Sequence, residues 1–439
     1  MDGVWRHPRR SVAVIGAGIS GLSAAWLLRE SAAVTLYEAE GRLGGHADTQ
    51  AVSLGGREIA VDTGFIVYNT LNYHHLTGLF AHLGVATEAS DMSFGVSIGE
   101  GALEYGGGSI PQLFAQKRNI ARPRFLAMLR DIVRFYREAP RLLESDDSPS
   151  LGAYLDRNGY GPGFIEDHIL PMGAAIWSAS VQAMHDFPAR SFVRFFVNHG
   201  LLRLSDRPRW RTVTGGSRRY VERIEETLGG AVRKAARVEA ILRDAGGVTV
   251  ALEDGSRARH DAVILATHGD EALRLLADAT EQERRILGAV RTQANRMVLH
   301  TDVALMPRRR AVWSSWNYLA RDREDLRREV SLTYWMNRLQ NLATPEPLLV
   351  TLNPLLEPDP GRVLLEKTYR HPCYDAAMIE AQLLLPTIQG VDRTWFCGAW
   401  TGHGFHEDGI ASAVTVARAF GVSPPWDSAA VAPALGRAA

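Results

Sequence analysis

The sequence has few cysteines and lysines, no long apolar run and no net charge. Its two cysteines, Cys373 and Cys397, are too few for a disulfide framework or a four-cysteine zinc site, and they suit a reducing compartment. Lysine and arginine together number 49, as do aspartate and glutamate, which argues against a general nucleic-acid-binding protein. No run reaches the roughly 18 apolar residues of a membrane span, and the start of the chain lacks the apolar core of a secretory signal. We therefore expect a cytoplasmic protein that binds no nucleic acid and no metal.

The chain, with 439 residues, is long enough for two or three packed domains, and its first segment alternates strand and helix. Residues 11–15 are predicted to form a buried parallel strand, residues 22–29 a helix and residues 34–37 a second strand. Further buried strands are predicted at 261–267 and 394–397, with aromatic and basic blocks between these pieces. This distribution predicts one discontinuous nucleotide domain with an inserted cap, rather than a string of separate domains.

A glycine turn, Gly16-x-Gly18-x-x-Gly21, separates the first strand from the helix, and Glu38 follows Gly21 by 17 residues. In this context the spacing predicts a dinucleotide site, because glycine permits the tight turn, the approach of a pyrophosphate and close helix–strand contact. The helix start presents free N–H groups to the phosphates, and the acid accepts hydrogen bonds from ribose hydroxyls. The residues predicted to contact the dinucleotide here are Gly16, Gly18, Ile19, Ser20, Gly21 and Glu38.

Later segments resemble the flavin-dependent amine oxidase superfamily. Residues 38–46 contain its E-x-x-x-R-x-G-G segment, residues 61–68 its D-x-G segment, residues 214–216 its returning G-G pair and residues 396–410 its final segment. The resemblance implies noncovalent FAD, because Cys397 lies inside a predicted strand rather than in a turn that links flavin. The further cofactor contacts that it implies are Arg42, Gly45, His46, Asp62, Thr63, Gly64, Phe65, Val238, Gly398, Asp408, Gly409 and Ile410.

The implied fold class is α/β, with a discontinuous Rossmann-type FAD-binding domain and an inserted α+β substrate (cap) domain, as in amine oxidases. The predicted division places FAD-binding parts at 1–66, 210–290 and 385–422, cap parts at 67–209 and 291–384, and a flexible tail at 423–439.

The sequence departs from the amine-oxidising members at three places. Residues 295–298 lack the lysine that those members hold near the flavin, and His406 stands where they have a cage tyrosine. Ala399 replaces an acid after the last strand. An amine or polyamine oxidase that produces hydrogen peroxide is therefore an alternative rather than the first hypothesis.

Four blocks resemble a narrower bacterial family that is often encoded beside cyclopropane-fatty-acid-synthase-like lipid methyltransferases. They are residues 195–202, 333–340, 371–375 and 397–409. The resemblance implies oxidation, in particular desaturation, of a methylated fatty acyl chain of a phospholipid, with hydride transfer to the flavin N5. It also implies a lipid methyltransferase as a partner. A non-catalytic flavin-binding partner of such a methyltransferase is a second alternative.

Candidate side chains for this chemistry follow from residue type and position. Histidine suits a proton shuttle near neutral pH, so the predicted catalytic residues are His371, His403, His406 and the neighbouring Glu407. Structural roles in the flavin loop and in turns stay open for them. The predicted substrate-binding residues are Trp177, Phe196, Trp316, Tyr334, Trp335 and Asn337, for which an ordinary core position is the alternative. The basic and apolar stretch 117–143 predicts either peripheral contact with the inner face of an anionic membrane or an amphipathic cap helix with solvated arginines.

Overall fold

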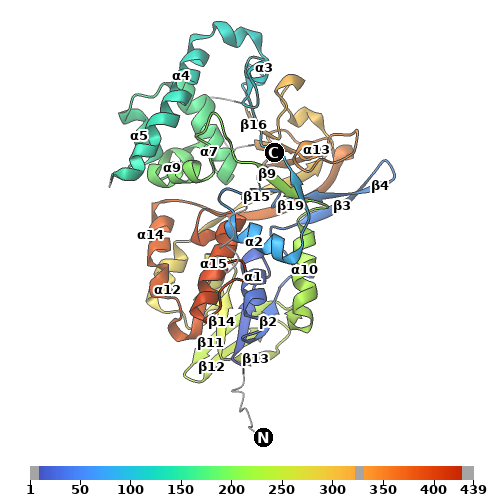
Figure 1. Ribbon diagram of the computed structural model, residues 1–439, viewed down its shortest axis with the longest axis vertical. Helices are drawn as coiled ribbons and strands as arrows, with labels where there is room; N and C mark the ends of the chain where they lie inside the picture. The colour runs from blue at the N-terminus through green and yellow to red at the C-terminus, as the bar shows by residue number, and fades with distance from the viewer. Residues whose placement is uncertain (1–8, 146, 322–330, 428–439) are drawn as a thin grey trace, which may run out of the picture.

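The computed structural model describes residues 9–145, 147–321 and 331–427. A five-stranded parallel sheet lies toward one end of the molecule, and a helical lobe and a seven-stranded sheet lie toward the other (Figure 1). The parallel sheet has the order β10–β2–β1–β14–β20. Its strands are β1 (Ser11–Ile15), β2 (Ala33–Tyr37), β10 (Val232–Arg233), β14 (Ala262–Leu265) and β20 (Thr394–Phe396).

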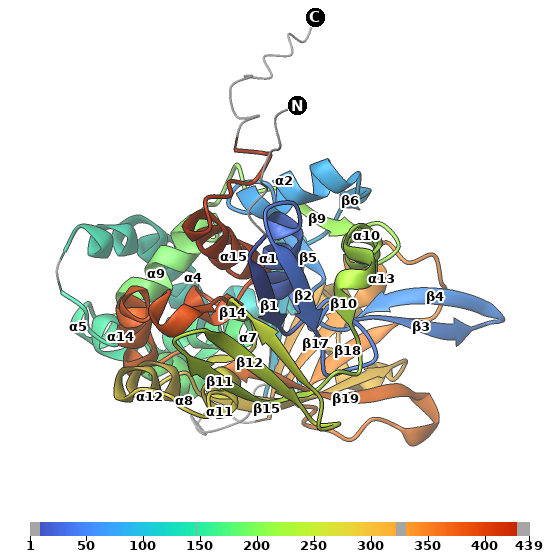
Figure 2. The same cartoon turned by 90° about the horizontal axis from the view of Figure 1, so that it is seen from below.

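Both faces of the parallel sheet are covered, which explains why its strands are apolar without alternation. Val12 and Val14 of β1 belong to the core that the sheet forms with helices α1 (Ile19–Leu28), α10 (Arg218–Leu228) and α15 (His406–Ala419). Ala13 and Ile15 point to the opposite face and join the core that includes Val248 of the small sheet β11–β12–β13. Figure 2 shows α1 beside α15 on one side of the sheet and β11 and β12 on the other.

The seven-stranded sheet forms the floor of the cap, in the order β19–β15–β18–β17–β16–β7–β8. All its pairings are antiparallel except the parallel pair β16–β7. Strands from both cap segments of the chain therefore meet in one sheet. They are β7 (Phe94–Ile98), β8 (Leu103–Gly106), β15 (Thr292–His300), β16 (Trp316–Ala320), β17 (Ser331–Trp335), β18 (Leu349–Leu352) and β19 (Val363–Pro372).

Smaller sheets and the remaining helices connect these layers. The other strands are β3 (Thr49–Leu54), β4 (Arg57–Asp62), β5 (Val67–Asn69), β6 (Thr87–Ala89), β9 (Trp210–Val213), β11 (Val238–Asp244), β12 (Gly247–Leu252) and β13 (Arg257–His260). The other helices are α2 (His74–Leu83), α3 (Ile110–Leu113), α4 (Pro123–Glu138), α5 (Leu151–Arg157), α6 (Pro162–Phe164), α7 (Leu170–Trp177), α8 (Val181–Asp186), α9 (Ala189–Asn198), α11 (Gly269–Leu275), α12 (Glu281–Gly288), α13 (Met336–Leu339) and α14 (Ala376–Leu384).

The architecture confirms the predicted fold class, because segments far apart in the chain build one Rossmann-type sheet and another set builds the cap. The exact domain boundaries stay predictions. The flexible tail is wrong for residues 423–427, since Trp426 stacks on Trp26 with ring centroids 6.0 Å apart and donates its Nε1–H to His75. Residues 428–439 of that predicted tail lie outside the described residues. Within the described ranges, no helix combines the length and the apolar character that crossing a membrane requires.

The basic stretch that includes α4 is an amphipathic cap helix. Phe125, Met128 and Phe135 on its apolar face are buried in the core of the helical lobe. Arg124 on the same helix pairs with Glu166, and Arg134 pairs with Glu138. The apolar face of α4 is therefore covered by the protein itself, and contact of the rest of the stretch 117–143 with a membrane stays a prediction.

Candidate active site

A cavity of about 1340 Å³ extends from the glycine turn after β1 to the seven-stranded sheet of the cap. Its lining joins parts of the chain that are hundreds of residues apart, because the carboxyl ends of β1, β2 and β14 open toward the cap. The predicted cofactor contacts that line it are Gly16, Gly18, Ile19, Ser20, Glu38, Gly45, His46, Thr63, Gly64, Phe65, Val238 and Gly398.

The glycine turn has the geometry that its spacing predicts. Gly16 has a φ of +95°, which favours glycine. A Cβ on Gly21 would lie 1.8 Å from the Gly16 carbonyl oxygen, so only glycine allows α1 to start this close to β1. A Cβ on Gly18 would meet nothing within 4 Å, which leaves the space in front of the helix start open. Backbone, rather than side chains, therefore forms this end of the cavity.

Glu38 is held in place at the end of β2. Its Oε2 accepts a hydrogen bond from the Ala17 N–H at 2.8 Å and its Oε1 accepts one from the Glu40 N–H at 2.9 Å. Burial raises the pKa of Glu38 despite these bonds. Each carboxylate oxygen keeps a further lone pair, so the side chain can still accept hydrogen bonds from a hydroxyl in the cavity.

The residues at this end of the cavity fit FAD. The Nε2 atom of His46 is buried and has no hydrogen-bond partner among the described residues, although buried polar atoms are rarely unsatisfied. His46 lies next to Gly45 and close to the glycine turn, so a ligand that contacts the turn can also satisfy this nitrogen. The cofactor would lie along Gly16–Ser20, with Glu38 at its ribose and Val238 at its adenine.

Two predicted acids serve the protein's own backbone instead of the cavity. Both carboxylate oxygens of Asp62 accept hydrogen bonds from the Ser217 N–H, at 2.9 and 3.0 Å, and the Gln340 amide donates to Oδ2. Asp62 thereby ties β4 to the turn at residues 214–216, and burial raises its pKa to about 6. Asp408 accepts from the Phe405 N–H at 2.9 Å and caps the start of α15. Neither side chain lines the cavity, so we withdraw both as direct cofactor contacts.

Four further predicted cofactor residues act by packing, and they too lie outside the cavity lining. Gly21 spaces α1 from β1, and a Cβ on Gly409 would lie 2.7 Å from Ile19, so Gly409 allows α15 to approach α1. Ile410 is fully buried between these helices. Arg42 donates to the Gly45 carbonyl at 3.0 Å and supports the turn that carries His46.

Glu407 is not positioned for catalysis. Its two carboxylate oxygens accept hydrogen bonds from the backbone N–H groups of His75 and Leu76, at 2.8 and 2.9 Å. These are free N–H groups in the first turn of α2, which the acid satisfies. Burial raises the pKa of Glu407 to about 7. The prediction of a catalytic role is corrected, because the carboxylate binds a helix end and does not line the cavity.

His406 lines the cavity but is held firmly between neighbours. Its ring stacks on Phe65 with centroids 3.7 Å apart, and its Nε2 is 3.1 Å from the Tyr220 hydroxyl. Burial lowers the pKa of His406 to about 3, so the ring is neutral. These contacts favour a structural role beside the cofactor over proton transfer.

His371 and His403 have nitrogen atoms available to the cavity. His371 lies 5.3 Å from His46, measured between ring centroids, and its Nδ1 is 2.8 Å from the Asn295 amide. His403 lies edge-on to Phe195 at 5.7 Å. Burial lowers the pKa of both His371 and His403 to about 4, so each ring is neutral near pH 7 and has one N–H donor and one unprotonated nitrogen.

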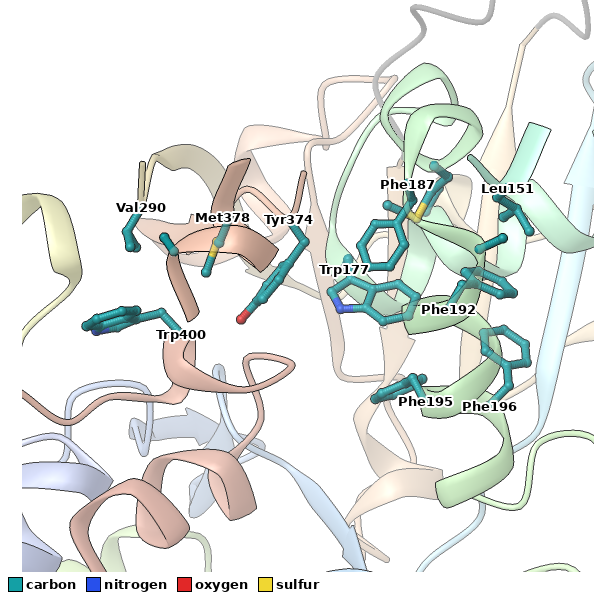
Figure 3. Packing of buried hydrophobic residues seen from close by; sticks show 14 of the residues in the cluster. Leu151, Trp177, Phe187, Phe192, Phe195, Phe196, Val290, Tyr374, Met378 and Trp400 are labelled. Carbon is teal, nitrogen blue, oxygen red and sulfur yellow. The ribbon is translucent and has the colours of Figure 1, made fainter. Parts of the chain in front are cut away.

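The predicted substrate residues divide into two groups. Trp177, Trp316 and Tyr334 line the cap side of the cavity. Phe196, Trp335 and Asn337 do not. Phe196 stacks on Phe192 at 4.2 Å inside the helical lobe, whereas Trp177 and Phe195 lie on the side of this cluster toward Tyr374 (Figure 3).

Trp335 packs edge-on against Trp313 at 5.6 Å, in a separate small cluster. The Asn337 amide donates to the carbonyls of Thr344 and Glu346 and accepts from the Leu348 N–H. We therefore reassign Phe196, Trp335 and Asn337 to packing and backbone support.

Sequence reasoning predicted His371 but missed two further polar residues on the same face of β19. Lys367, Tyr369 and His371 are two residues apart, and alternate residues of a strand share one face. The Lys367 ammonium pairs with Asp48 at 2.7 Å, and the Tyr369 hydroxyl donates to Asp48 and lies 2.7 Å from the Thr63 hydroxyl. The period-two pattern in residues 366–371 was a signal for this group. In the sheet, Lys367 pairs with Met297 of β15. Met297 belongs to residues 295–298, the segment that lacks the lysine of the amine-oxidising members.

Comparison with known proteins agrees with this geometry. The family model of flavin-containing amine oxidoreductases matches residues 19–420. The fold is similar to that of a fatty acid isomerase from P. acnes that produces CLA, with a TM-score of 0.65, 17% identity, and 94% of this chain and 99% of that chain covered. It is also similar to a putative protoporphyrinogen oxidase from Exiguobacterium sp. 255-15, with a TM-score of 0.66, 18% identity and coverages of 94% and 99%.

A putrescine oxidase bound to putrescine has a TM-score of 0.63, 17% identity and coverages of 94% and 98%. No curated protein matches the sequence. At these identities the structures establish the fold alone. The match over most of the chain, together with the glycine turn and the cavity beside it, shows that the chain belongs to the family of flavin-containing amine oxidoreductases and is an FAD-dependent oxidoreductase.

Proposed function

We propose that the protein oxidises a fatty acyl chain of an anionic phospholipid, by removing a hydride and a proton from adjacent carbons. A methylated acyl chain is the substrate that we favour. Bound FAD supplies the acceptor for the hydride, which is chemistry that protein side chains lack. The protein's own part is to bind the chain, exclude water and accept the proton.

The observation that carries this proposal is the charge of the cavity on its cap side. Among the described lining residues there, Asp91 is the one acid, and it is paired with Arg338 at 3.0 Å. Three arginines, Arg207, Arg209 and Arg211, line the same part of the cavity. A cationic lining attracts a phosphate and repels an ammonium group.

Apolar side chains from helices α7 and α9 also line the cavity. They include Met172, Ile176, Trp177 and Phe195, all of which line the cavity. An acyl chain is recognised by burial of its surface, at roughly 0.8 kcal/mol for each CH₂ group removed from water. The arrangement of cationic and apolar lining therefore suits an anionic amphiphile.

His403 is the proton acceptor that we favour. Its ring lines the cavity beside the apolar cluster, and none of the hydrogen bonds in the described part of the chain involves its ring nitrogens. Burial holds it neutral, as a base must be before it accepts a proton. His406 serves as the comparison, because its Nε2 is bonded to Tyr220.

The experiment is anaerobic bleaching of the bound flavin by candidate donors. Phospholipids with and without methyl-branched acyl chains are compared with a panel of amines that includes putrescine. We expect bleaching by branched phospholipid and the loss of two hydrogen atoms from the acyl chain by mass spectrometry. His403→Gln should slow bleaching by about 10²-fold or more, while His406→Gln should change it much less.

Bleaching by an amine alone, with peroxide on reoxidation, would replace the proposal with the amine oxidase alternative. A protein that retains FAD and that no donor bleaches would favour a non-catalytic partner of a lipid methyltransferase.

The double variant Arg207→Gln and Arg209→Gln separates the effect of charge from that of apolar burial. It should raise the KM for an anionic phospholipid more than the KM for a zwitterionic one.

We also propose that the tip of the cap contacts the membrane that holds the substrate. Ile110, Ile120 and Leu126 there are 75%, 59% and 45% exposed, and the exposed Lys117 and Arg118 lie between them in sequence. Apolar side chains among cations suit an anionic lipid surface. Sedimentation with anionic vesicles tests this contact, with Ile110→Asp and Ile120→Asp expected to weaken it and Val391→Asp, on another exposed apolar residue, as the control.

A further inference from the structure

We propose that Asn353 and Asn295 are positioning residues that set the tautomer of His371, so that its Nε2–H faces the cavity as a hydrogen-bond donor. This inference goes beyond the proposed reaction and holds whatever the substrate is. It rests on a chain of three hydrogen bonds whose first donor is a backbone N–H.

The first bond fixes the orientation of the Asn353 amide. The Arg296 N–H on β15 donates to the Asn353 Oδ1 at 3.0 Å. A backbone N–H can only donate, so the atom that it meets is the oxygen of the side chain. The other end of the Asn353 amide is therefore the Nδ2 donor. The backbone of Asn353 has a φ of +48°, a conformation that asparagine tolerates better than most residues.

The second bond transfers this orientation to Asn295. The Asn353 Nδ2 donates to the Asn295 Oδ1 at 2.7 Å, so the Asn295 Nδ2 points the other way, toward the His371 Nδ1 at 2.8 Å. Asn295 is 1% exposed, which keeps water from replacing either partner. An NH₂ group can only donate, so the His371 Nδ1 accepts and carries no proton.

The third step follows from the charge of the ring. A neutral imidazole has one proton, which must then be on Nε2. His371 is neutral because burial lowers its pKa to about 4. The titratable groups around it are His46, Tyr369 and His268, and none of them is an acid that would favour a doubly protonated ring.

The Nε2–H of His371 has no acceptor among the described residues, and the ring lines the cavity. The ligand that satisfies it offers a lone pair, such as a carbonyl oxygen or a ring nitrogen, rather than a protonated amine. A protonated Nε2 also cannot take up a proton from a substrate. The relay therefore assigns His371 to ligand orientation and leaves proton transfer to another group.

The test is nuclear magnetic resonance of the full-length, FAD-loaded protein labelled with ¹⁵N at histidine. Long-range ¹H–¹⁵N spectra distinguish the two tautomers, and His371→Gln assigns the resonances. We expect wild-type His371 as a single Nε2–H tautomer. His300 is an internal control, because its Nδ1 accepts from the Asp302 N–H and its Nε2 lies 2.7 Å from the Thr351 hydroxyl, away from the relay.

Asn353→Asp is the decisive variant, because it does not alter any residue bonded to the ring. The carboxylate that it introduces can only accept, so the Asn295 amide must turn its Nδ2 toward that carboxylate and its Oδ1 toward His371. We expect the tautomer of His371 to invert to Nδ1–H while His300 is unchanged. Asn198→Asp, which adds the same charge at the exposed end of α9, should change neither histidine.

Two results would overturn the proposal: a wild-type His371 with its proton on Nδ1, and a folded Asn353→Asp variant that keeps the Nε2–H tautomer. If Asn353→Asp does not fold by circular dichroism, Asn295→Leu decides, since it removes the donor to Nδ1. We expect it to give a mixture of tautomers, and a single unchanged Nε2–H signal would reject the relay.

Discussion

Two of the glycine-containing segments at the cavity, residues 16–21 and 398–410, use their residues in opposite ways. At residues 16–21 the backbone and the lack of side chains form the surface, and Gly18 leaves open space. At residues 398–410 the side chains of Glu407 and Asp408 turn back and satisfy N–H groups of the protein itself. A motif can therefore mark a ligand site directly, or mark the packing that holds one in place.

The largest expected effect is that of Gly21→Ala. The new Cβ would lie 1.8 Å from the Gly16 carbonyl oxygen, so α1 must move away from β1. We expect bound FAD to fall by more than about tenfold, equivalent to about 1.4 kcal/mol, as measured by flavin absorbance per protein. Gly41→Ala is the matched control, since a Cβ there meets nothing within 4 Å. Normal FAD content in Gly21→Ala would contradict the close packing.

Asp62→Asn should have the next largest effect, on stability. The carboxylate accepts from Ser217, Thr49 and Gln340, and an amide nitrogen there would face donors. We expect the free energy of unfolding to fall by about 3 kcal/mol, measured by urea denaturation. Asp156→Asn, at an exposed position, should change it by less than about 0.5 kcal/mol. Equal midpoints for the two variants would show that Asp62 does not join β4 to the turn.

Glu407→Gln sharpens the contrast between capping and catalysis. In the folded protein the pKa of Glu407 is about 7, above its ordinary value of 4.5. The contribution of Glu407 to the free energy of unfolding is therefore full below pH 4.5 and is lost as the pH rises through 7. The variant should flatten this decline in the free energy of unfolding, and weaker capping should cost about 1 kcal/mol.

Denaturation at pH 4.5 and pH 7.5 measures this slope, with the exposed Glu144→Gln as the control. Flavin bleaching by substrate should persist in Glu407→Gln, and its loss in a folded, FAD-loaded variant would restore a catalytic role for this acid.

The smallest effect is expected for Trp335→Phe. Trp335 packs on Trp313 outside the cavity, and its Nε1 has no hydrogen-bond partner within residues 9–145, 147–321 and 331–427, so phenylalanine removes an unsatisfied N–H. We expect KM and kcat to change by less than about twofold, which corresponds to well under the roughly 1.4 kcal/mol of a tenfold change. Trp316→Phe alters the cavity lining and should raise KM several-fold. A larger effect at 335 than at 316 would reverse the assignment of the two tryptophans.

The strand–turn–helix segment was predictable because its signals are local. Within residues 11–38 the strand, the glycine turn, the helix and the second strand follow one another directly, so the pattern can be recognised there although α1 also packs on α10 and α15 and β1 pairs with β14. The cap was harder to predict. Trp316 and Trp335 are both aromatic and both flank strands, but one faces the cavity and the other a small separate core.

The sequence by itself predicted a dinucleotide site and the discontinuous α/β architecture, since glycine spacing and apolar periodicity follow from backbone geometry, and the resemblance of later segments to flavin-dependent amine oxidases implied FAD. It also placed His371, His403 and His406 beside the cavity. Only the tertiary structure decided what each one does there. Asn295, Asn353 and His371 come from three strands, β15, the end of β18 and β19, and the direction of a hydrogen bond between them depends on which atoms the sheet brings within 3 Å. Long-range contact, rather than residue type, distinguishes a proton acceptor from a donor and a helix cap from a catalytic acid.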